Sequence, residues 1–135
     1  MHWPSPGRIT TGISNLLRTG IDLIEVSRIQ QAIERHGQRF VDRIYTPGEC
    51  RYCKSRYTSF AARFAAKEAV AKALGTGIGY VTFREIEIVN DVQGRPELAL
   101  HGAAAELAQS LGLITWSVSL SHTQDYAVAS VVAMG

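Results

Sequence analysis

The stretch from Arg63 to Gly75 reads Arg-Phe-Ala-Ala-Lys-Glu-Ala-Val-Ala-Lys-Ala-Leu-Gly. It contains no proline and no glycine before its last residue, and helix-forming residues dominate it, so its helix propensity is high. Gly75 suits a C-terminal cap, and we expect a helix over about residues 58–74. One face carries only alanine, which lets a neighbouring element approach closely, and a second face is larger and apolar. Two apolar faces predict a helix at the centre of the fold.

Four charged residues lie within this predicted helix: Arg63, Lys67, Glu68 and Lys72. Charged side chains are seldom fully buried unless they are paired. Glu68 and Lys72 are four residues apart, in the order that stabilises a surface helix by roughly 0.2–0.5 kcal/mol. The charges therefore either face solvent or line a site, and the helix alone leaves both interpretations open.

The length and composition limit the class of protein. The chain has 135 residues, of which 46% are hydrophobic and 19% charged, so we expect one soluble domain. A net charge of +2 without a basic run argues against a nucleic-acid partner. No apolar run is long enough for a membrane span, and residues 1–18 lack the apolar core of a secretory signal, so we expect a cytoplasmic protein. Residues 1–17 are interpreted as a flexible N-terminal extension, and residues 18–135 as a single domain.

The two cysteines, Cys50 and Cys53, form a lone Cys-x-x-Cys motif. A structural zinc site needs a second pair of ligands, and the sequence offers no matching pair. A redox motif normally follows a strand, whereas this pair follows the helix-start signal Thr46-Pro47-Gly48-Glu49. We therefore predict two thiols without a metal or a redox role.

The remaining elements follow from hydrophobic periodicity and turn signals. Before the central helix we expect a strand at 18–24, a helix at 27–36, a short helix at 40–44 and another helix opening at Thr46-Pro47. After it we expect strands at 83–89 and 97–100 joined by a turn, a helix at 101–111, and strands at 114–120 and 126–132. This order predicts an α+β fold in which an antiparallel sheet packs against the long central helix.

Three polar residues stand out against this pattern. Asp22 lies inside a predicted strand, where Asp is unfavourable; Glu68 lies on the central helix; His122 lies at a strand end. Two carboxylates near cations form an ordinary ion-pair arrangement. They also suit Mg²⁺, which binds one or two carboxylates together with waters and substrate phosphates. The residue chemistry leaves both interpretations open.

Three motifs resemble, in the same order along the chain, those of the holo-acyl-carrier-protein synthases, which are small 4′-phosphopantetheinyl transferases. They are Gly20-Ile21-Asp22-Leu23-Ile24-Glu25-Val26-Ser27-Arg28-Ile29, Arg63-Phe64-Ala65-Ala66-Lys67-Glu68-Ala69 followed by Lys72, and Ser119-Leu120-Ser121-His122-Thr123. Residues 75–79 and the turn at 94–96 are also similar to that family. The resemblance covers about residues 18–133. Residues 1–17 depart from it, because such proteins usually begin just before the first strand.

The resemblance implies a reaction and a metal. Phosphopantetheine would pass from coenzyme A to a serine of an acyl carrier protein, releasing adenosine 3′,5′-bisphosphate, in fatty acid biosynthesis. The family binds Mg²⁺ through the residues that match Asp22 and Glu68, and a cation there would neutralise charge on the pyrophosphate. Glu68 is the candidate to orient or accept the serine proton. Lys72 completes the expected catalytic set and would meet a phosphate.

The resemblance also implies binding residues and an assembly. The expected contacts with coenzyme A come from phosphate-binding and adenine-packing residues: Arg63, Lys67, Lys72, Pro96, His122 and Thr123. The expected docking residues for the acidic carrier protein are Arg28, Arg35 and Arg39. The family is typically trimeric, so we expect a homotrimer with active sites between subunits.

Two alternatives remain at this level. The acceptor could instead be a carrier domain of a polyketide or peptide synthase. The chain could also be a non-enzymatic α+β module that binds a nucleotide or a partner helix, with structural charges only.

Overall fold

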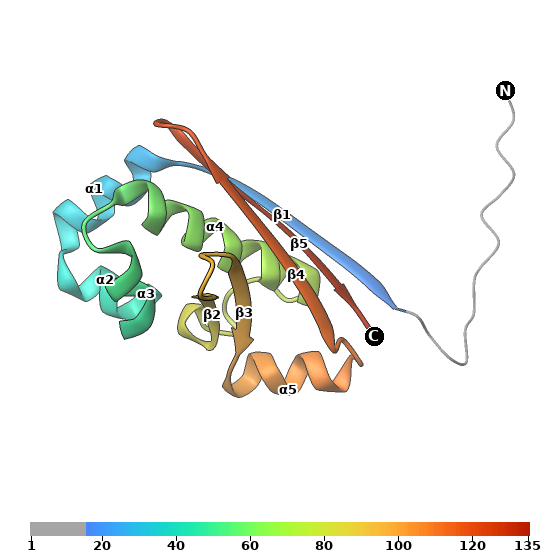
Figure 1. Ribbon diagram of the computed structural model, residues 1–135. Helices are drawn as coiled ribbons and strands as arrows, with labels where there is room; N and C mark the ends of the chain where they lie inside the picture. The colour runs from blue at the N-terminus through green and yellow to red at the C-terminus, as the bar shows by residue number, and fades with distance from the viewer. Residues whose placement is uncertain (1–15) are drawn as a thin grey trace, which may run out of the picture.

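The computed structural model describes residues 16–135 (Figure 1). Nearly all of the predicted extension, residues 1–15, lies outside the described residues. The first strand begins at Leu17, one residue before the expected domain start.

The predicted order of helices and strands is confirmed. The elements are β1 (Leu17–Glu25), α1 (Val26–His36), α2 (Gln38–Ile44), α3 (Pro47–Cys53), α4 (Tyr57–Leu74), η1 (Phe83–Glu85), β2 (Ile86–Asn90), β3 (Pro96–Leu100), α5 (Gly102–Ser110), β4 (Thr115–His122) and β5 (Tyr126–Met134). The capping signal at Thr46 also behaves as expected, because its hydroxyl accepts from the backbone N–H of Glu49 while the Glu49 carboxylate accepts from that of Thr46.

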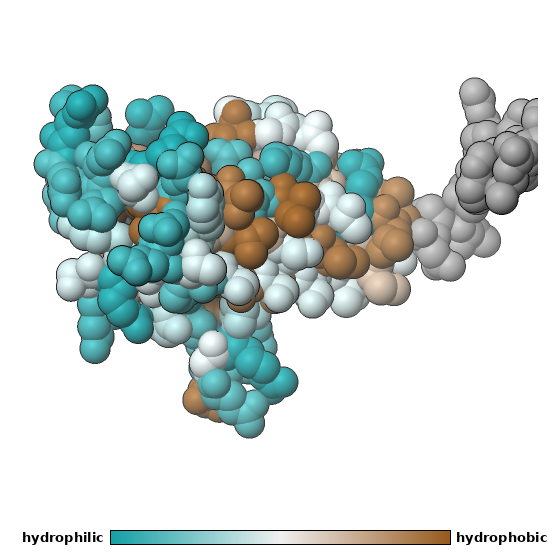
Figure 2. Space-filling model, turned by 90° about the horizontal axis from the view of Figure 1, so that it is seen from above, coloured by the Kyte–Doolittle hydropathy of each residue, from teal (hydrophilic) through white to brown (hydrophobic). Residues whose placement is uncertain are grey.

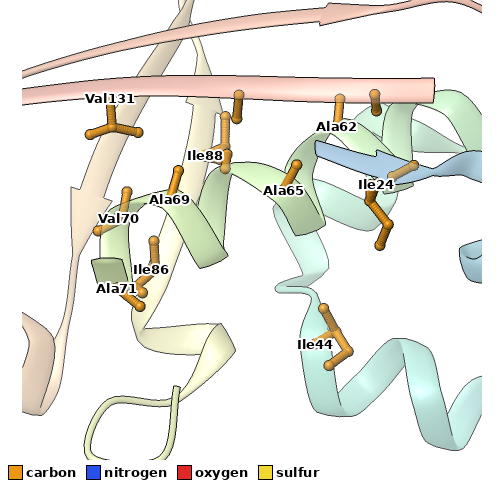
Figure 3. Close-up of a cluster of buried hydrophobic side chains, with 14 of the residues drawn as sticks. Ile24, Ile44, Ala62, Ala65, Ala69, Val70, Ala71, Ile86, Ile88 and Val131 are labelled. Atoms are coloured by element: carbon orange, nitrogen blue, oxygen red, sulfur yellow. The ribbon is translucent and has the colours of Figure 1, made fainter. Parts of the chain in front are cut away.

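Helix α4 is the centre of the molecule. Thirteen of its 18 residues are buried, and it packs against the sheet on one side and against α1, α3 and β2 elsewhere (Figure 1). Figure 3 shows alanine and valine side chains of α4, including Ala65, Ala69 and Val70, lying between the sheet and the β2 strand. Small side chains on this helix let both layers approach its backbone closely.

The expected antiparallel sheet is divided into two. The larger sheet has the order β1-β5-β4, so the last of the described strands lies in the middle, paired antiparallel with the first of them. The hairpin of β2 and β3 forms a separate two-stranded sheet. Pro96 begins β3, which among the described strands has β2 as its one hydrogen-bonded neighbour, so the missing N–H of proline disturbs no central ladder.

Residues 83–85 correct the expectation of a strand over 83–89. They form a short 3₁₀ turn, and β2 begins only at Ile86. The cause is Glu85, whose carboxylate accepts hydrogen bonds from the backbone N–H and the hydroxyl of Thr82 and from the backbone N–H of Ala103. A local side-chain cap therefore outcompetes the alternating pattern that favoured a strand.

The outer face of the larger sheet carries exposed apolar side chains. Leu17, Ile21 and Leu23 of β1 are each more than 60% exposed, and Val132 and Met134 lie beside them on β5. Figure 2, which views the molecule from above, shows brown hydrophobic side chains gathered among paler and teal neighbours. An exposed apolar surface of this kind is typical of an interface. Among the described residues, none of the helices has the length and apolar character that crossing a bilayer requires.

Candidate active site

The two carboxylates singled out in the sequence line one cavity. Asp22 comes from β1 and Glu68 from α4, and the cavity has a volume of about 380 Å³. Arg28 of α1 lies at the same cavity. The remaining lining is largely apolar: Leu23, Ile24, Ile29, Ala32, Phe40 and Phe64. The site therefore combines two negative groups and one positive group with a hydrophobic wall.

The alternation of β1 explains why Asp22 enters this cavity. Asp22 lies opposite Ala129 of β5, which is fully buried, and so it shares the sheet's inner face with Gly20 and Ile24. Its side chain remains 19% exposed. The side chain of Asp22 is thus directed toward α4, whereas a polar side chain in a strand ordinarily faces solvent.

The charge of the site acts on Glu68. Partial burial raises the pKa of the Glu68 carboxyl, the charge of Asp22 raises it further, and the ammonium of Lys72 lowers it only in part. Lys72 itself donates to Asp22 Oδ1 at 3.0 Å and to the carbonyl oxygen of Ile21 at 2.9 Å. Two neighbouring carboxylates with incomplete neutralisation form a site that favours an added cation.

The donor chemistry of the pair fits Mg²⁺. Asp22 and Glu68 supply oxygen ligands only, and Mg²⁺ usually binds one or two carboxylates while waters and substrate phosphates fill its remaining positions. Within residues 16–135 no group of three or more His, Cys, Asp or Glu side chains could form a cage for a metal. A two-carboxylate site that shares its cation with a phosphate is therefore the arrangement that these residues suit.

Lys67 is a correction to the expected coenzyme A contacts. Its side chain is fully buried, and its ammonium donates to Glu49 Oε1 at 2.7 Å and to the carbonyl oxygens of Phe83 and Ile86. A lysine has three N–H donors, and all three are used inside the protein. Lys67 therefore joins α4 to α3 and β2 and has no donor left for a phosphate.

Arg63 lies away from the cavity of Asp22 and Glu68, on the side of α4 that faces α3. It is 4% exposed, its guanidinium lies 4.1 Å above the ring of Tyr52, and its Nη2 donates to Asn90 Oδ1 at 2.8 Å. Its Nη1 donates to the carbonyl of Ser59, whereas its Nε is buried and has no hydrogen-bond partner within residues 16–135. Buried donors are rarely left unsatisfied, so this guanidinium keeps bonding capacity for an acceptor.

The other expected coenzyme A contacts lie elsewhere again. Pro96 lines a cavity of about 550 Å³ between β3 and β4, together with Arg95 and Trp116. His122 and Thr123 lie at the exposed end of the β4–β5 hairpin. None of these residues is among the described residues that line the cavity of Asp22 and Glu68. The structure of one chain thus separates the expected coenzyme A residues into several places.

The three expected docking arginines are all exposed. Arg28 and Arg35 lie on α1 and share a shallow surface hollow, and Arg28 also lines the cavity of Asp22. Arg39 lies on α2. Positive charge therefore continues from the rim of the cavity along α1.

Cys50 and Cys53 are both free thiols in the described part of the chain. Cys53 is fully buried, and burial raises its pKa to about 12, while burial also raises the pKa of the Cys50 thiol. Thiols that hold their protons this firmly are poor nucleophiles and poor metal ligands at neutral pH.

Sequence reasoning missed several residues of the site. Phe40 and Ile29 line the cavity but looked like ordinary core positions in amphipathic helices. Glu49 was interpreted as a helix cap, and its second role as the partner of Lys67 had no sequence signal. Gly20 did carry a signal, because glycine inside a strand often marks a close backbone approach.

Comparison with known proteins agrees with this geometry. A family model described as the 4′-phosphopantetheinyl transferase superfamily matches residues 18–131. A holo-[acyl-carrier-protein] synthase of Herpetosiphon aurantiacus is 55% identical over 127 residues, covering 89% of this chain and 100% of the relative. Another from Koribacter versatilis is 54% identical over 121 residues, covering 87% of this chain and 97% of the relative.

Solved structures give the same result. The holo-[acyl-carrier-protein] synthase of Helicobacter pylori in complex with coenzyme A is 34% identical, with a TM-score of 0.79 over 85% of this chain and 98% of that chain. The corresponding protein of Neisseria meningitidis is 39% identical, with a TM-score of 0.79 over 86% and 96%. The chain therefore belongs to the 4′-phosphopantetheinyl transferase superfamily, and within it to the holo-[acyl-carrier-protein] synthases.

Proposed function

We propose that this enzyme transfers 4′-phosphopantetheine from coenzyme A to a serine of apo acyl carrier protein in fatty acid biosynthesis, with Mg²⁺ held by Asp22 and Glu68. The other product is adenosine 3′,5′-bisphosphate. The observation that carries the proposal is the shared cavity, in which Asp22 of β1 and Glu68 of α4 lie beside the cationic Arg28 and an apolar wall. The names of the relatives and of the coenzyme A complex support the substrates.

The side chains of the site have separate tasks in this proposal. Mg²⁺, when bound, supplies a positive charge for the pyrophosphate of coenzyme A. Glu68 orients or accepts the serine proton. Lys72 reaches the same region from the next turn of α4 and approaches a phosphate from the side of Asp22. Arg28 attracts the acidic carrier protein toward the cavity.

The apolar wall of the cavity excludes water around the reacting groups. Phe64 and Phe40 lie in it beside the two carboxylates. Removing water strengthens the attraction between cations and phosphate oxygens, because the local dielectric constant falls. It also protects the pyrophosphate of coenzyme A from attack by water in place of the serine.

We further propose that the enzyme is a homotrimer whose active sites lie between subunits. Two features of the single chain support this. The outer face of the larger sheet exposes Ile21, Leu23 and neighbouring apolar side chains. In addition, Pro96, His122 and Arg63 lie apart from Asp22 and Glu68, so a second subunit could bring some of them to the same coenzyme A molecule. Sedimentation equilibrium tests the assembly directly, and a monomer with full activity contradicts it.

The test of the function is mass spectrometry of apo acyl carrier protein after incubation with coenzyme A, Mg²⁺ and this enzyme. We expect a mass gain equal to phosphopantetheine, abolished by EDTA and absent with Asp22→Asn. A parallel reaction with a polyketide or peptide synthase carrier domain identifies the preferred acceptor. Faster modification of the synthase domain contradicts the assignment to fatty acid biosynthesis, and no mass gain on either acceptor contradicts the transfer.

A further inference from the structure

Strand β1 touches the backbone of helix α4 at Gly20. A Cβ atom built on Gly20 lies only 1.9 Å from the carbonyl oxygen of Ala69 and 2.8 Å from its carbonyl carbon. Both residues are buried, and the neighbouring atoms are main-chain atoms that no side-chain rotation can move. Strand and helix must therefore move apart by about an ångström before the Cβ–oxygen distance reaches the 3.0 Å that real Cβ atoms keep.

This contact is next to both members of the carboxylate pair. Asp22 follows Gly20 by two residues, so it lies on the same face of β1, about 6.5–7 Å further along the strand. Glu68 directly precedes Ala69 on α4. Because Gly20 and Ala69 meet without an intervening side chain, the separation between β1 and α4 at this point fixes how far apart Asp22 and Glu68 can lie.

Two side-chain hydrogen bonds between β1 and α4 restrict how β1 could move if position 20 carried a side chain. Arg18 donates through Nη1 to the carbonyl oxygen of Ala73 at 3.3 Å, on one side of the contact. Lys72 donates to the carbonyl oxygen of Ile21 at 2.9 Å, on the other side. With β1 held lengthwise at both points, a side chain at position 20 can be accommodated only by lifting the strand away from the helix.

We propose that Gly20 is a positioning residue for the carboxylate pair: its missing side chain sets the gap between β1 and α4 across which Asp22 and Glu68 would together hold one divalent cation. The inference rests on the proposed function, since both carboxylates must hold the cation. Gly20 touches neither the metal nor a substrate, and it acts through the separation of β1 from α4.

The experiment compares four proteins: wild type, Gly20→Ala, Asp22→Glu, and the double variant that combines both changes. Mg²⁺ binding is measured by titration calorimetry in the presence of coenzyme A, and unfolding is followed by circular dichroism. We expect Gly20→Ala to weaken Mg²⁺ binding at least about tenfold, the scale seen when groups that position metal ligands are altered. Asp22→Glu should weaken it similarly, because a longer side chain enters an unchanged gap.

The double variant separates positioning from general stability. The extra methylene of glutamate adds about 1.5 Å, close to the distance by which the strand must lift. We therefore expect the double variant to bind Mg²⁺ more tightly than either single variant, while its melting temperature stays at the level of Gly20→Ala. If the loss of Mg²⁺ affinity in the double variant equals the sum of the losses, in free energy, of the two single variants, the proposal is overturned.

Thr19→Ala is the matched control, since Thr19 lies on the outer face of β1, where a change leaves the contact with α4 intact. Its Mg²⁺ affinity should equal that of wild type. If Gly20→Ala does not fold, the test rests on Asp22→Glu. Unchanged Mg²⁺ affinity in that variant would overturn the proposal, because it would show that the gap between β1 and α4 does not have a fixed width.

Asp22→Asn distinguishes failure of this inference from failure of the proposed function. If Asp22→Asn keeps wild-type Mg²⁺ affinity and turnover, the assignment of the cation to Asp22 is wrong. If Asp22→Asn loses both while Gly20→Ala binds Mg²⁺ as wild type does, the function stands and the positioning role of Gly20 falls.

Discussion

The ammonium of Lys72 binds Asp22 across the space between α4 and β1, with an Nζ–Oδ1 distance of 3.0 Å. It also holds the carbonyl oxygen of Ile21. The sequence offered Glu68, four residues earlier on the same helix, as the obvious partner of Lys72. Lys72 takes a partner on the strand instead, and Glu68 has no ion pair with any residue in the described part of the chain.

Replacing Lys72 by methionine should therefore separate activity from stability. The ion pair is half exposed on the lysine side, and exposed pairs contribute roughly 0–1 kcal/mol. We expect a small change in the urea midpoint but a loss of turnover of about a hundredfold or more, because the variant loses the cation that we propose to meet the phosphates. Steady-state kinetics with saturating carrier protein checks this. Wild-type turnover in the folded variant removes Lys72 from the catalytic set.

Glu68→Gln should stabilise the metal-free protein while abolishing transfer. The pKa of Glu68 is raised above its ordinary value of 4.5 in the folded state, so ionising it opposes folding at neutral pH. The cost is fully present above the folded pKa and vanishes below about pH 4.5. We expect a higher melting temperature for Glu68→Gln than for wild type at pH 7, with the difference shrinking as the pH falls to 4.

Added Mg²⁺ provides the control for that prediction. A ligand that binds the folded state raises the melting temperature, so Mg²⁺ should stabilise wild type and leave Glu68→Gln nearly unchanged. A variant that gains as much from Mg²⁺ as wild type would falsify the metal role of Glu68.

Arg63→Ala should reduce the preference for coenzyme A over dephospho-coenzyme A. The planar guanidinium suits a phosphate, and its buried Nε has no partner among the described residues. Wild type should use dephospho-coenzyme A less efficiently, and the ratio of kcat/KM values should move toward one in Arg63→Ala. Arg43→Ala, on the exposed part of α2, is the control. An unchanged ratio in a folded Arg63→Ala protein places the 3′-phosphate elsewhere.

Arg28→Glu should weaken binding of the carrier protein, chiefly through the association rate. Arg28 lies at the rim of the cavity and exposes its charge on α1. Complementary charges at a rim govern encounter rates more than dissociation, so the KM for carrier protein should rise while the affinity for coenzyme A stays the same. Added salt should weaken wild type more than the variant. Arg84→Glu, exposed on η1, makes the same charge change elsewhere and should keep the wild-type KM at low salt.

Lys67→Met should destabilise the fold strongly. It leaves Glu49 as a buried charge without its cation, and such losses cost about 3–5 kcal/mol. The double variant Lys67→Met with Glu49→Gln removes both charges and should recover much of the loss, which urea unfolding measures. In the folded double variant the KM for coenzyme A should be unchanged. A raised KM at wild-type stability would return Lys67 to the phosphate site.

The sequence predicted the elements well because each carries its own local signal. Hydrophobic spacing identified α4, and alternation identified β4 and β5. The predicted strand at residues 83–85 was wrong because a local signal was misleading there. The carboxylate of Glu85 accepts hydrogen bonds from the backbone N–H groups of Thr82 and Ala103, and the alternating pattern could not reveal those bonds. Local patterns thus predict which face of an element is buried but not which side chains bind one another across the fold.

The candidate site was predictable only as far as its motifs reached. Asp22 and Glu68 lie 46 positions apart in the sequence, and the family resemblance suggested their pairing before the structure brought them to one cavity. The sequence did not reveal that Lys67 is the partner of Glu49, because Glu49 lies in another helix and looked like a simple cap. A buried ion pair between distant elements leaves no periodicity in the sequence.

The position of β5 between β1 and β4 has a consequence for synthesis of the protein. Among the described elements β5 is synthesised after all the others, yet within residues 16–135 the strand that carries Asp22 has its one sheet partner in those nine residues. Until β5 has been made, β1 lacks this partner, and pairing between strands so far apart in the sequence is a slow, non-local step. An unfinished copy therefore cannot assemble the charged cavity. A premature stop codon within β5 should therefore abolish transfer, although Asp22 and Glu68 are already present in the shortened chain.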